Sequence, residues 1–279
     1  MSDRYADLHI HTCFSDGSDT PEEVVRRAAQ AGLSAVGITD HDTVDGVAPA
    51  MREAASAGIE VLAGVELSSD YHGKDIHILG YLFDLNDSPL VKKLREMRQV
   101  RVDRMKKMVA RLAELGVRGV TFEEVAGLTR SDAVGRLHLA QILVAKKAVP
   151  SLEAAFERYL GEGAAAYFPK YLQTPFEAIR LIRESGGIAV LAHPMLTQRD
   201  ELIPAFVKAG LDGLEAYYPN CSMAVANFYV GLAQKHGLLV TGGSDSHGKG
   251  KTSTYIGKAF LPGVHLEKMK ALAAQRRTV

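Results

Sequence analysis

Two histidines near the start of the chain, His9 and His11, have the spacing of a pair of metal ligands. Side chains two residues apart in a β-strand project from the same face, so both imidazoles would point into the same space. Two imidazoles placed in this way can bind one divalent ion such as zinc. The pair alone does not decide between a metal site and two histidines packed in a core.

More ligand-type side chains lie in or just after other apolar runs of the sequence. We predict strands near 5–10, 35–40, 60–67, 76–82, 188–193, 213–218 and 238–244. The ligand-type residues that accompany them are Asp16, His41, Glu66, His77, His193, Asp245 and His247. The carboxyl ends of the strands of a β/α barrel meet at one mouth, where active sites are built. We therefore expect these side chains to converge with His9 and His11.

The segments between these strands have the pattern of helices. Thr20-Pro21 and Thr174-Pro175 each offer an N-cap followed by proline, and Glu23 and Glu177 complete capping boxes. Several predicted strands are apolar on both faces, as a parallel sheet covered by helices requires. The alternation of strand and helix predicts a parallel α/β barrel with seven strands, one fewer than the usual eight.

The alternation stops between residues 88 and 172, where the pattern is helical throughout. We predict a barrel domain formed by 1–87 and 173–279, and a helical insertion at 88–172 that stands over one end of the barrel. The first helix of the insertion carries only two acidic residues, Glu96 and Asp103. Its basic residues are Lys92, Lys93, Arg95, Arg98, Arg101, Arg104, Lys106, Lys107 and Arg111.

The overall composition excludes some functions. The 279 residues include 33 basic and 33 acidic side chains, so no net charge attracts nucleic acid or an anionic membrane. The two cysteines, Cys13 and Cys221, form no C-x-x-C pair, which fits a reducing compartment. The first residues lack a secretory signal, and no apolar run is long enough for a membrane span. We predict a cytoplasmic protein without membrane contact or an obligate protein partner.

Taken together, these positions resemble the PHP superfamily, named for polymerase and histidinol phosphatase. The matching motifs are Asp7-Leu8-His9-Ile10-His11-Thr12, Ser15-Asp16-Gly17, Thr39-Asp40-His41, Gly64-Val65-Glu66, Ala192-His193-Pro194 and Gly243-Ser244-Asp245-Ser246-His247. They run in order over nearly the whole chain. The resemblance implies a distorted (β/α)7 barrel with a helical insertion. It also implies phosphoester hydrolysis with two to three divalent ions, most often Mn²⁺, with Fe²⁺ or Zn²⁺ as alternatives.

The resemblance also assigns ligands to each ion. One ion would take His9, His11, Glu66 and Asp245; a second would take Glu66, His77 and His193; a third would take Asp16, His41 and His247. Within this set we expect Asp16, His41, His193 and His247 to act in catalysis. Asp7 and Asp40 are expected to orient ligand imidazoles. No ligand position is substituted, which argues against a non-catalytic member.

Mixed imidazole and carboxylate ligands favour manganese, iron or zinc over magnesium or calcium. Such ions activate water near neutral pH and neutralise charge on a phosphoryl group. A phosphomonoester carries two negative charges, so it suits a three-ion site better than a neutral amide does. The residues therefore predict hydrolysis of a phosphomonoester.

The basic insertion is expected to choose the substrate. Arg98, Arg101 and Arg104 recur every three residues on one helical face, and Gly135 would let a ligand approach the backbone beside Arg136. These features resemble the stand-alone bacterial branch of the superfamily, which removes the 3′-phosphate of nucleoside 3′,5′-bisphosphates such as pAp. We predict a nucleotide substrate, bound by Arg101, Arg104, Gly135 and Arg136. The alternatives are a 5′-3′ exoribonuclease on short RNA, a histidinol phosphate phosphatase, an amidohydrolase or a non-enzymatic metal-dependent module.

Some of these residues have simpler interpretations. His77 could be a core histidine, and the arginines could form a solvated helix face. We expect no function for His72, His138, His236 and His265, and a packing role for Cys13. Glu215 and Tyr217 end the sixth predicted strand and could line the pocket.

Overall fold

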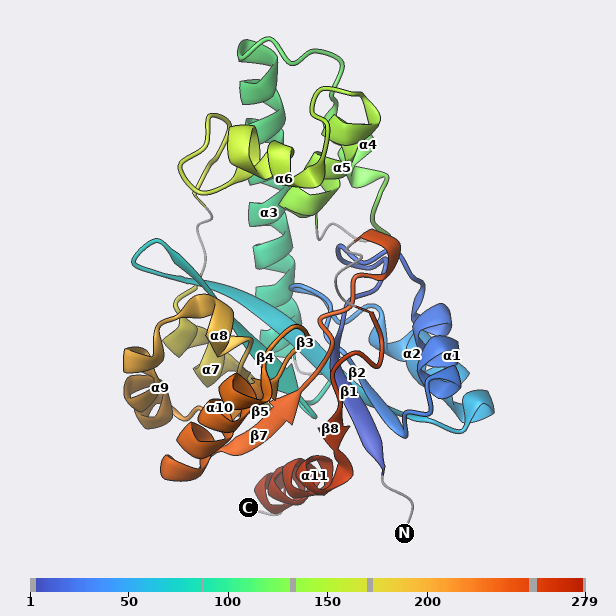
Figure 1. Ribbon diagram of the computed structural model, residues 1–279, viewed down its shortest axis with the longest axis vertical. Coiled ribbons are helices and arrows are strands. Elements are labelled where there is room, and N and C mark those ends of the chain that lie inside the picture. The colour runs from blue at the N-terminus through green and yellow to red at the C-terminus, as the bar shows by residue number, and fades with distance from the viewer. Residues whose placement is uncertain (1–3, 87, 131–133, 170–172, 251–254, 278–279) are drawn as a thin grey trace.

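Eight strands form one sheet that curls into a nearly closed barrel in the computed structural model, which describes residues 4–86, 88–130, 134–169, 173–250 and 255–277 (Figure 1). The strands are β1 (Tyr5–Ile10), β2 (Ala35–Ile38), β3 (Glu60–Tyr71), β4 (Lys74–Tyr81), β5 (Ile188–Leu191), β6 (Gly213–Tyr217), β7 (Leu239–Gly242) and β8 (Leu261–Pro262). Their order in the sheet is β7-β6-β5-β4-β3-β2-β1-β8. The segment after β7 returns to β1, where the His11 N–H donates to the Ser246 carbonyl at 2.9 Å. This contact closes the ring at the carboxyl end of β1.

The seven predicted strands are confirmed, with small changes at their ends. The sequence pattern did not indicate β8, which has only two residues and pairs antiparallel with the start of β1. A two-residue strand is too short to show a period of alternating side chains.

The prediction of a wholly parallel barrel was wrong at β4. This strand runs antiparallel to both of its neighbours, β3 and β5. The reason is the loop between β3 and β4, which consists of His72 and Gly73 only. Both have positive φ, 53° and 79°, as a two-residue hairpin turn requires. A parallel connection would need a crossover of a dozen or more residues.

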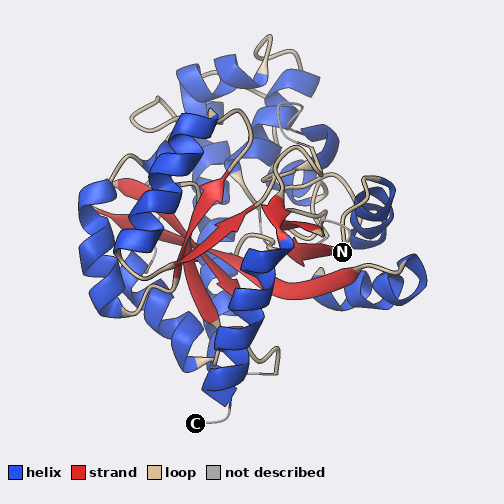
Figure 2. Cartoon of the chain, turned by 60° about the horizontal axis from the view of Figure 1, so that its bottom comes forward, coloured by secondary structure: helices blue, strands red, loops and turns tan. Residues whose placement is uncertain are grey.

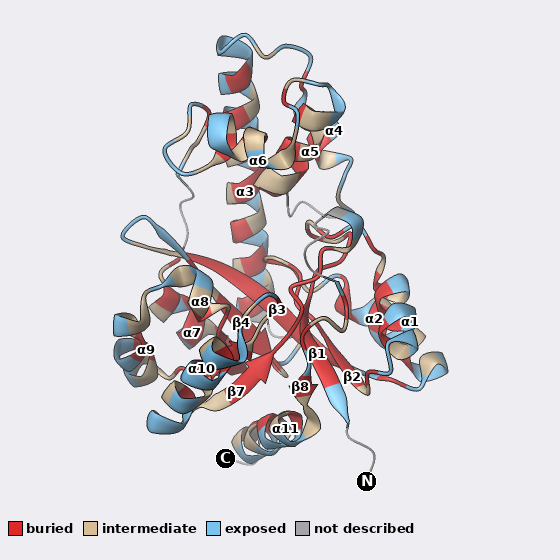
Figure 3. Cartoon of the chain, in the orientation of Figure 1, coloured by how far each residue is buried: buried red, intermediate tan, exposed pale blue. Residues whose placement is uncertain are grey.

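Helices surround the barrel (Figure 2), and its strands are almost fully buried (Figure 3). The barrel helices are α1 (Pro21–Gln30), α2 (Val47–Ala57), α7 (Pro175–Glu184), α8 (Pro194–Thr197), α9 (Ile203–Ala209), α10 (Met223–Lys235) and α11 (Gly263–Arg277). The predicted capping boxes at Thr20 and Thr174 are confirmed, since in each box both hydrogen bonds form. α11 lies at the end of the barrel away from the insertion (Figure 1).

The segment after β4 is helical, as predicted, and rises above the barrel (Figure 1). It contains α3 (Ser88–Glu114), α4 (Phe122–Ala126), α5 (Arg136–Ala145), α6 (Leu152–Ala155) and a π-helical turn, Phe156–Leu160. Leu90, Leu94 and Met97 of α3 pack into the barrel core, whereas Met108 and Leu112 belong to a separate apolar cluster. One long helix therefore contributes side chains to both apolar cores. The predicted boundaries at 87 and 172 fall on residues outside the described part of the chain.

Within the described ranges, no helix has the length and apolar character needed to cross a lipid bilayer.

Candidate metal centre

Histidines and carboxylates from six strands meet at the mouth of the barrel, beneath the insertion. β4 runs antiparallel to both of its neighbours, so His77, in its amino-terminal half, lies toward the rim at which the parallel strands end. His41 forms a parallel bridge with Glu66, which brings the loop after β2 against β3. The chain reversal missed by the sequence pattern is thus what brings His77 to the site.

Four donor atoms of this cluster lie close to one another. The Nε2 atoms of His9 and His11 are 3.2 Å apart. Each lies 3.2–3.5 Å from Glu66 Oε2 and from Asp245 Oδ1. His9, His11 and Asp245 form one candidate group, in which one donor atom of each residue lies within 4.8 Å of the others. The donor set therefore fits a first-row divalent ion.

Glu66 connects these donors with two further histidines. Its Oε1 atom lies 2.8 Å from His77 Nδ1 and 3.1 Å from His193 Nε2. Its Oε2 atom, which faces His9 and His11, also lies 3.1 Å from His41 Nδ1. Glu66 is only 1% exposed, so both oxygens are used inside the cluster. One carboxylate can in this way bridge two ions.

A third group surrounds Asp16. Its Oδ1 atom is 3.3 Å from His247 Nε2, and its Oδ2 atom is 3.9 Å from His41 Nε2. His11 completes the group, in which one donor atom of each residue lies within 4.8 Å of the others. All nine predicted ligands thus lie in one cluster, with His11 and His41 each between two groups. How the ligands divide among individual ions stays a prediction.

The electrostatics of the cluster favour bound cations. Burial alone would raise the pKa of Glu66, but His41 and His77 hold it well below its usual range. Burial alone would lower the pKa of His11, but Asp245 and Glu66 outweigh it and raise this pKa to about 10. The buried carboxylates are therefore stabilised in their ionised form by nearby positive charge. Among the described residues, Asp16 Oδ1 and His41 Nδ1 are buried without a well-aligned hydrogen-bond partner, as expected of atoms that face an ion.

Asp7 and Asp40 do not contact a ligand imidazole directly, but Asp40 is linked to one through the Ser15 hydroxyl, which lies 3.5 Å from His11 Nδ1. Asp40 accepts from the Thr12 backbone N–H at 2.7 Å and from the Ser15 hydroxyl at 2.5 Å. Asp7 accepts from the Ser244 backbone N–H at 2.8 Å. Both carboxylates hold the loops that carry ligands, because their short side chains reach backbone groups at the strand ends rather than the rings.

The imidazoles are oriented by other acidic residues. Glu215 Oε1 lies 3.0 Å from His9 Nδ1, and Asp75 Oδ1 lies 3.2 Å from His77 Nε2. We expected Glu215 to line the pocket, and it is fully buried at the site. The pattern did not single out Asp75, since a carboxylate beside a hairpin turn is common in surface loops.

The end of β6 departs from the expected alternation. A register shift lies between Glu215 and Tyr217. Tyr217 instead lies near His265, with ring centroids 6.2 Å apart. The next residue, Tyr218, reaches the site and donates its hydroxyl to Asp245 Oδ2 at 2.7 Å. A bulge changes which side chains face inward, and the sequence gives no local sign of it.

The three arginines predicted to share a face of α3, Arg98, Arg101 and Arg104, all contact protein groups. Arg101 is buried; its Nε donates to Asp42 Oδ2 at 2.5 Å and its Nη2 to Ser68 Oγ at 2.6 Å. Its Nη1 lies 4.0 Å from the position that a Cβ of Gly135 would take. Arg98 donates to Thr43 Oγ1 at 3.0 Å. Arg101 thus joins the insertion to the barrel, and its Nη1 lies beside Gly135.

Arg104 and Arg136 form a pair above the β3–β4 hairpin. Both guanidinium groups lie over the ring of Tyr167, at 5.4 and 5.7 Å from its centroid. Burial and the charge of Arg136 lower the pKa of Arg104 to about 10. Arg136 Nη2 is 3.6 Å from Asp75, the carboxylate that contacts His77. The arginine pair therefore lies one side chain away from the metal cluster.

Gly135 caps α5 and lies against Asp16. A Cβ at this position would meet Asp16 atoms at 3.6–3.7 Å, which is ordinary van der Waals contact. The protein itself therefore does not require glycine here, and a ligand at this backbone stays a prediction. His138 packs in the interior, where its Nδ1 accepts the Gly135 N–H at 3.1 Å. Cys13 is buried, as expected of a packing residue.

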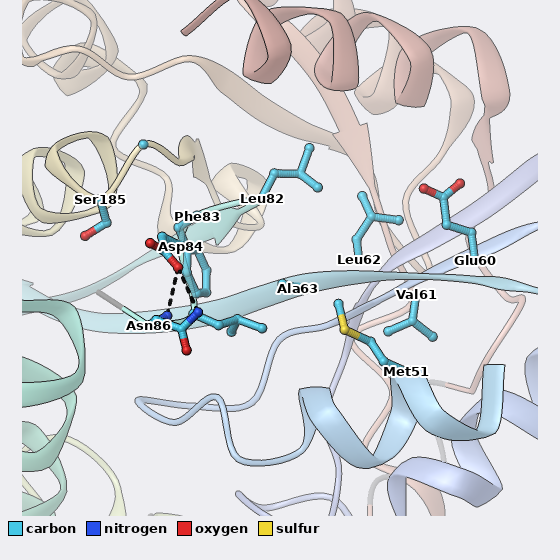
Figure 4. A pocket seen from close by; sticks show the side chains of 12 residues that line it. Met51, Glu60, Val61, Leu62, Ala63, Leu82, Phe83, Asp84, Asn86 and Ser185 are labelled. Atoms are coloured by element: carbon cyan, nitrogen blue, oxygen red, sulfur yellow. Dashed lines mark hydrogen bonds between the residues drawn. The ribbon is translucent and has the colours of Figure 1, made fainter. Parts of the chain in front are cut away.

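A wide cavity lies elsewhere in the molecule. It measures about 580 Å³ and is formed where β3 begins and β4 ends (Figure 4). Its lining includes Met51, Leu62, Ala63, Leu82 and Phe83. None of the predicted ligands or substrate-binding arginines lines it. The cavity is therefore separate from the chemistry at the mouth of the barrel.

A barrel that carries a histidine–carboxylate cluster at its mouth defines the class of metal-dependent hydrolases. The comparison with known families is more specific: the PHP domain family matches residues 7–174, and the chain belongs to this family. A 3′,5′-nucleoside bisphosphate phosphatase of Chromobacterium violaceum is 33% identical over 90% of each chain. A 5′-3′ exoribonuclease of Escherichia coli is 34% identical over 86% of this chain and 84% of its own.

A solved structure supports the same conclusion. A protein of Bifidobacterium adolescentis, assigned as a metal-dependent phosphoesterase, superposes with a TM-score of 0.88 at 30% identity, over 96% of both chains. The predicted barrel fold and the resemblance to the PHP superfamily are confirmed. The site is that of a PHP-family phosphoesterase with side chains able to bind metal ions.

Proposed function

We propose that this protein is a Mn²⁺-dependent phosphatase that removes the 3′-phosphate from nucleoside 3′,5′-bisphosphates. The observation that carries the proposal is the position of Asp75 between the metal cluster and the arginine pair, 3.2 Å from His77 and 3.6 Å from Arg136. Two anion-binding features at this separation suit a substrate with two phosphates. The Chromobacterium violaceum relative is named for this activity.

The residues divide into two roles. The nine clustered histidines and carboxylates would hold the divalent ions, which when bound supply Lewis-acid activation of water and of the phosphoryl group. Arg104 and Arg136 would bind the second phosphate, and they remain protonated at neutral pH because even the lowered pKa of Arg104 is about 10. Tyr167 packs beneath both guanidinium groups and fixes their position.

The test is release of inorganic phosphate from adenosine 3′,5′-bisphosphate, 3′-AMP and 5′-AMP. We expect the bisphosphate to be the best substrate and 5′-AMP to be its product. Chelation should abolish turnover, and Mn²⁺ should restore it. A chelated protein that turns over these substrates equally well would contradict the metal assignment, and release of the 5′-phosphate would contradict the substrate assignment.

The arginine pair can be tested separately. Because each hydrogen bond to a charged group contributes about 1.5–3 kcal/mol, Arg104→Ala and Arg136→Ala should raise KM for the bisphosphate about tenfold or more. KM for 3′-AMP, which lacks the second phosphate, should change little. Arg95→Ala, an exposed arginine of the same helix, is the matched control and should affect neither substrate. Equal effects on both substrates would contradict the role of the pair.

A second candidate function is 5′-3′ exoribonuclease activity on short RNA. It is favoured by the Escherichia coli relative, whose identity to this chain equals that of the phosphatase within one percentage point. The same arginines would then bind the 5′-phosphate of the RNA. A time course on a labelled oligonucleotide separates the two: successive mononucleotides indicate the nuclease, and loss of terminal phosphate alone indicates the phosphatase.

A further inference from the structure

Glu215 is a buried carboxylate that belongs to none of the three groups of candidate ligands. It lies on β6 with no exposed surface. Both of its oxygens are engaged: Oε1 lies 3.0 Å from His9 Nδ1, and Oε2 accepts the backbone N–H of His193 at 2.8 Å. One side chain therefore contacts two candidate ligands that come from different strands, β1 and β5.

The contact with His9 determines which ring nitrogen is free to bind a cation. An ionised carboxylate can only accept hydrogen bonds, so Nδ1 of His9 must carry the hydrogen that it donates to Glu215. The remaining nitrogen, Nε2, lies 3.4 Å from Glu66 Oε2 and 3.5 Å from Asp245 Oδ1. In the neutral ring, Nε2 carries the lone pair, on the side of Glu66 and Asp245.

The contact with His193 acts on the backbone. His193 has φ 28° and ψ 57°, a conformation that non-glycine residues rarely adopt. Its N–H is held by Glu215, which stabilises this conformation at the point where the chain leaves β5. The rings of His9 and His193 stack at 22° with centroids 5.8 Å apart. Glu215 thus aligns both.

We infer that Glu215 is a positioning residue that makes His9 a ligand through Nε2 and holds the backbone of His193 in place for the second ion. The inference rests on the proposed metal centre and extends it to a residue that would not touch any ion. Carboxylates that hydrogen-bond ligand histidines have measurable effects, since their replacement typically weakens metal binding about 10–100-fold.

Glu215→Gln tests the inference because it keeps the shape and changes the hydrogen-bonding pattern. The backbone N–H of His193 can only donate, so the amide oxygen must turn toward it. The amide NH₂ then faces His9 Nδ1 and can only donate to it. His9 would place its hydrogen on Nε2, aimed at Glu66 and Asp245, and an N–H cannot bind a cation.

The experiment combines metal titration with ¹⁵N NMR of the histidine rings in the full chain. In the wild-type chain we expect Nδ1 of His9 to carry a hydrogen with or without Zn²⁺. In Glu215→Gln we expect this hydrogen to be lost and Zn²⁺ and Mn²⁺ to bind about 10–100-fold more weakly at one site. Unchanged affinity, or an unchanged Nδ1 hydrogen, would overturn the inference.

Two further variants separate positioning from general stability. Asp212→Asn alters another buried carboxylate, just before β6, which accepts the Ala189 N–H at 2.9 Å at the opposite end of the barrel. It should lower the thermal midpoint and leave metal affinity unchanged. Glu215→Asp keeps two acceptor oxygens, so we expect His9 in this variant to keep its Nδ1 hydrogen. This variant tests the inference even if Glu215→Gln does not fold, and loss of the Nδ1 hydrogen in Glu215→Asp would count against the inference. A wild-type chain that binds no divalent ion would contradict the proposed function, and the NMR result would still decide the role of Glu215.

Discussion

Replacing Arg101 with alanine should destabilise the protein strongly, because Arg101 forms a buried ion pair between the insertion and the barrel. Asp42 has no exposed surface and Arg101 is 7% exposed. The Arg101 guanidinium contacts Asp42 at 2.5 Å and Ser68 at 2.6 Å, and the Ser68 N–H donates to the other oxygen of Asp42 at 2.8 Å. Breaking a buried pair by removing one partner typically costs about 3–5 kcal/mol.

The measurement is urea unfolding of the metal-free chain, which separates this effect from metal binding. Arg101→Ala should lower the free energy of unfolding by about 3–5 kcal/mol with an unchanged m-value. Arg95→Ala, on the exposed face of the same helix, should stay within about 0.5 kcal/mol of the wild type. The double variant Arg101→Met, Asp42→Asn removes both charges, and asparagine tolerates the φ of 52° at position 42. Its free energy of unfolding should therefore fall by less than that of Arg101→Ala.

A loss below about 1 kcal/mol for Arg101→Ala would refute this account, since that is the contribution of an exposed ion pair. Arg101 would then be free to bind substrate, as the sequence suggested. A large loss would mean that kinetic effects of Arg101 variants report on the joint between insertion and barrel as well as on substrate.

Two other predictions concern pH. Burial raises the pKa of Asp7 from 3.8 to about 6, so Asp7 contributes stability below pH 4 that is lost as the pH rises through 6. Urea unfolding of the wild type and of Asp7→Asn measures the difference between their free energies of unfolding. Between pH 4 and 7 this difference should shift by about 3 kcal/mol in favour of the variant. A difference that does not change with pH would contradict the burial of this charge. Burial alone would lower the pKa of His11 and of His77, but nearby carboxylates outweigh burial and raise these values to about 10 and about 9. Both rings are therefore protonated near pH 7 without metal. Metal binding should therefore release protons, and the metal affinity should increase as the pH rises. Calorimetry in buffers of different ionisation enthalpy would detect the released protons. Binding without proton release would argue that these rings are not ligands.

Much of the barrel could be predicted from the sequence because its strands are short apolar runs between clear helix starts. The orientation of β4 was missed, although His72 and Gly73 stand between two apolar runs and a two-residue turn permits only an antiparallel hairpin. The turn itself contained the information. Recognising it would have placed His77 at the rim from the sequence alone.

The candidate ligands could be predicted because they follow strands, and strand ends meet at one rim. The groups that support them could not. Asp42 contacts Arg101 because α3 packs against the loop after β2 at one particular position along the helix. No local sequence pattern specifies that position. Tyr218 faces the site only because a bulge follows Glu215. These contacts depend on tertiary packing rather than on periodicity.

The β3–β4 hairpin has a consequence for the order in which the site assembles. Glu66 and His77 lie eleven residues apart on paired strands, and His41, just after β2, forms a parallel bridge with Glu66. Contacts so close in sequence carry a small loop-closure cost, which favours their early formation. The donors His41, Glu66 and His77 are all available once residue 81 has left the ribosome, whereas His9 and His11 wait for Asp245. The group of His41, Glu66 and His77 therefore depends on local contacts, whereas the other two candidate groups depend on closure of the barrel.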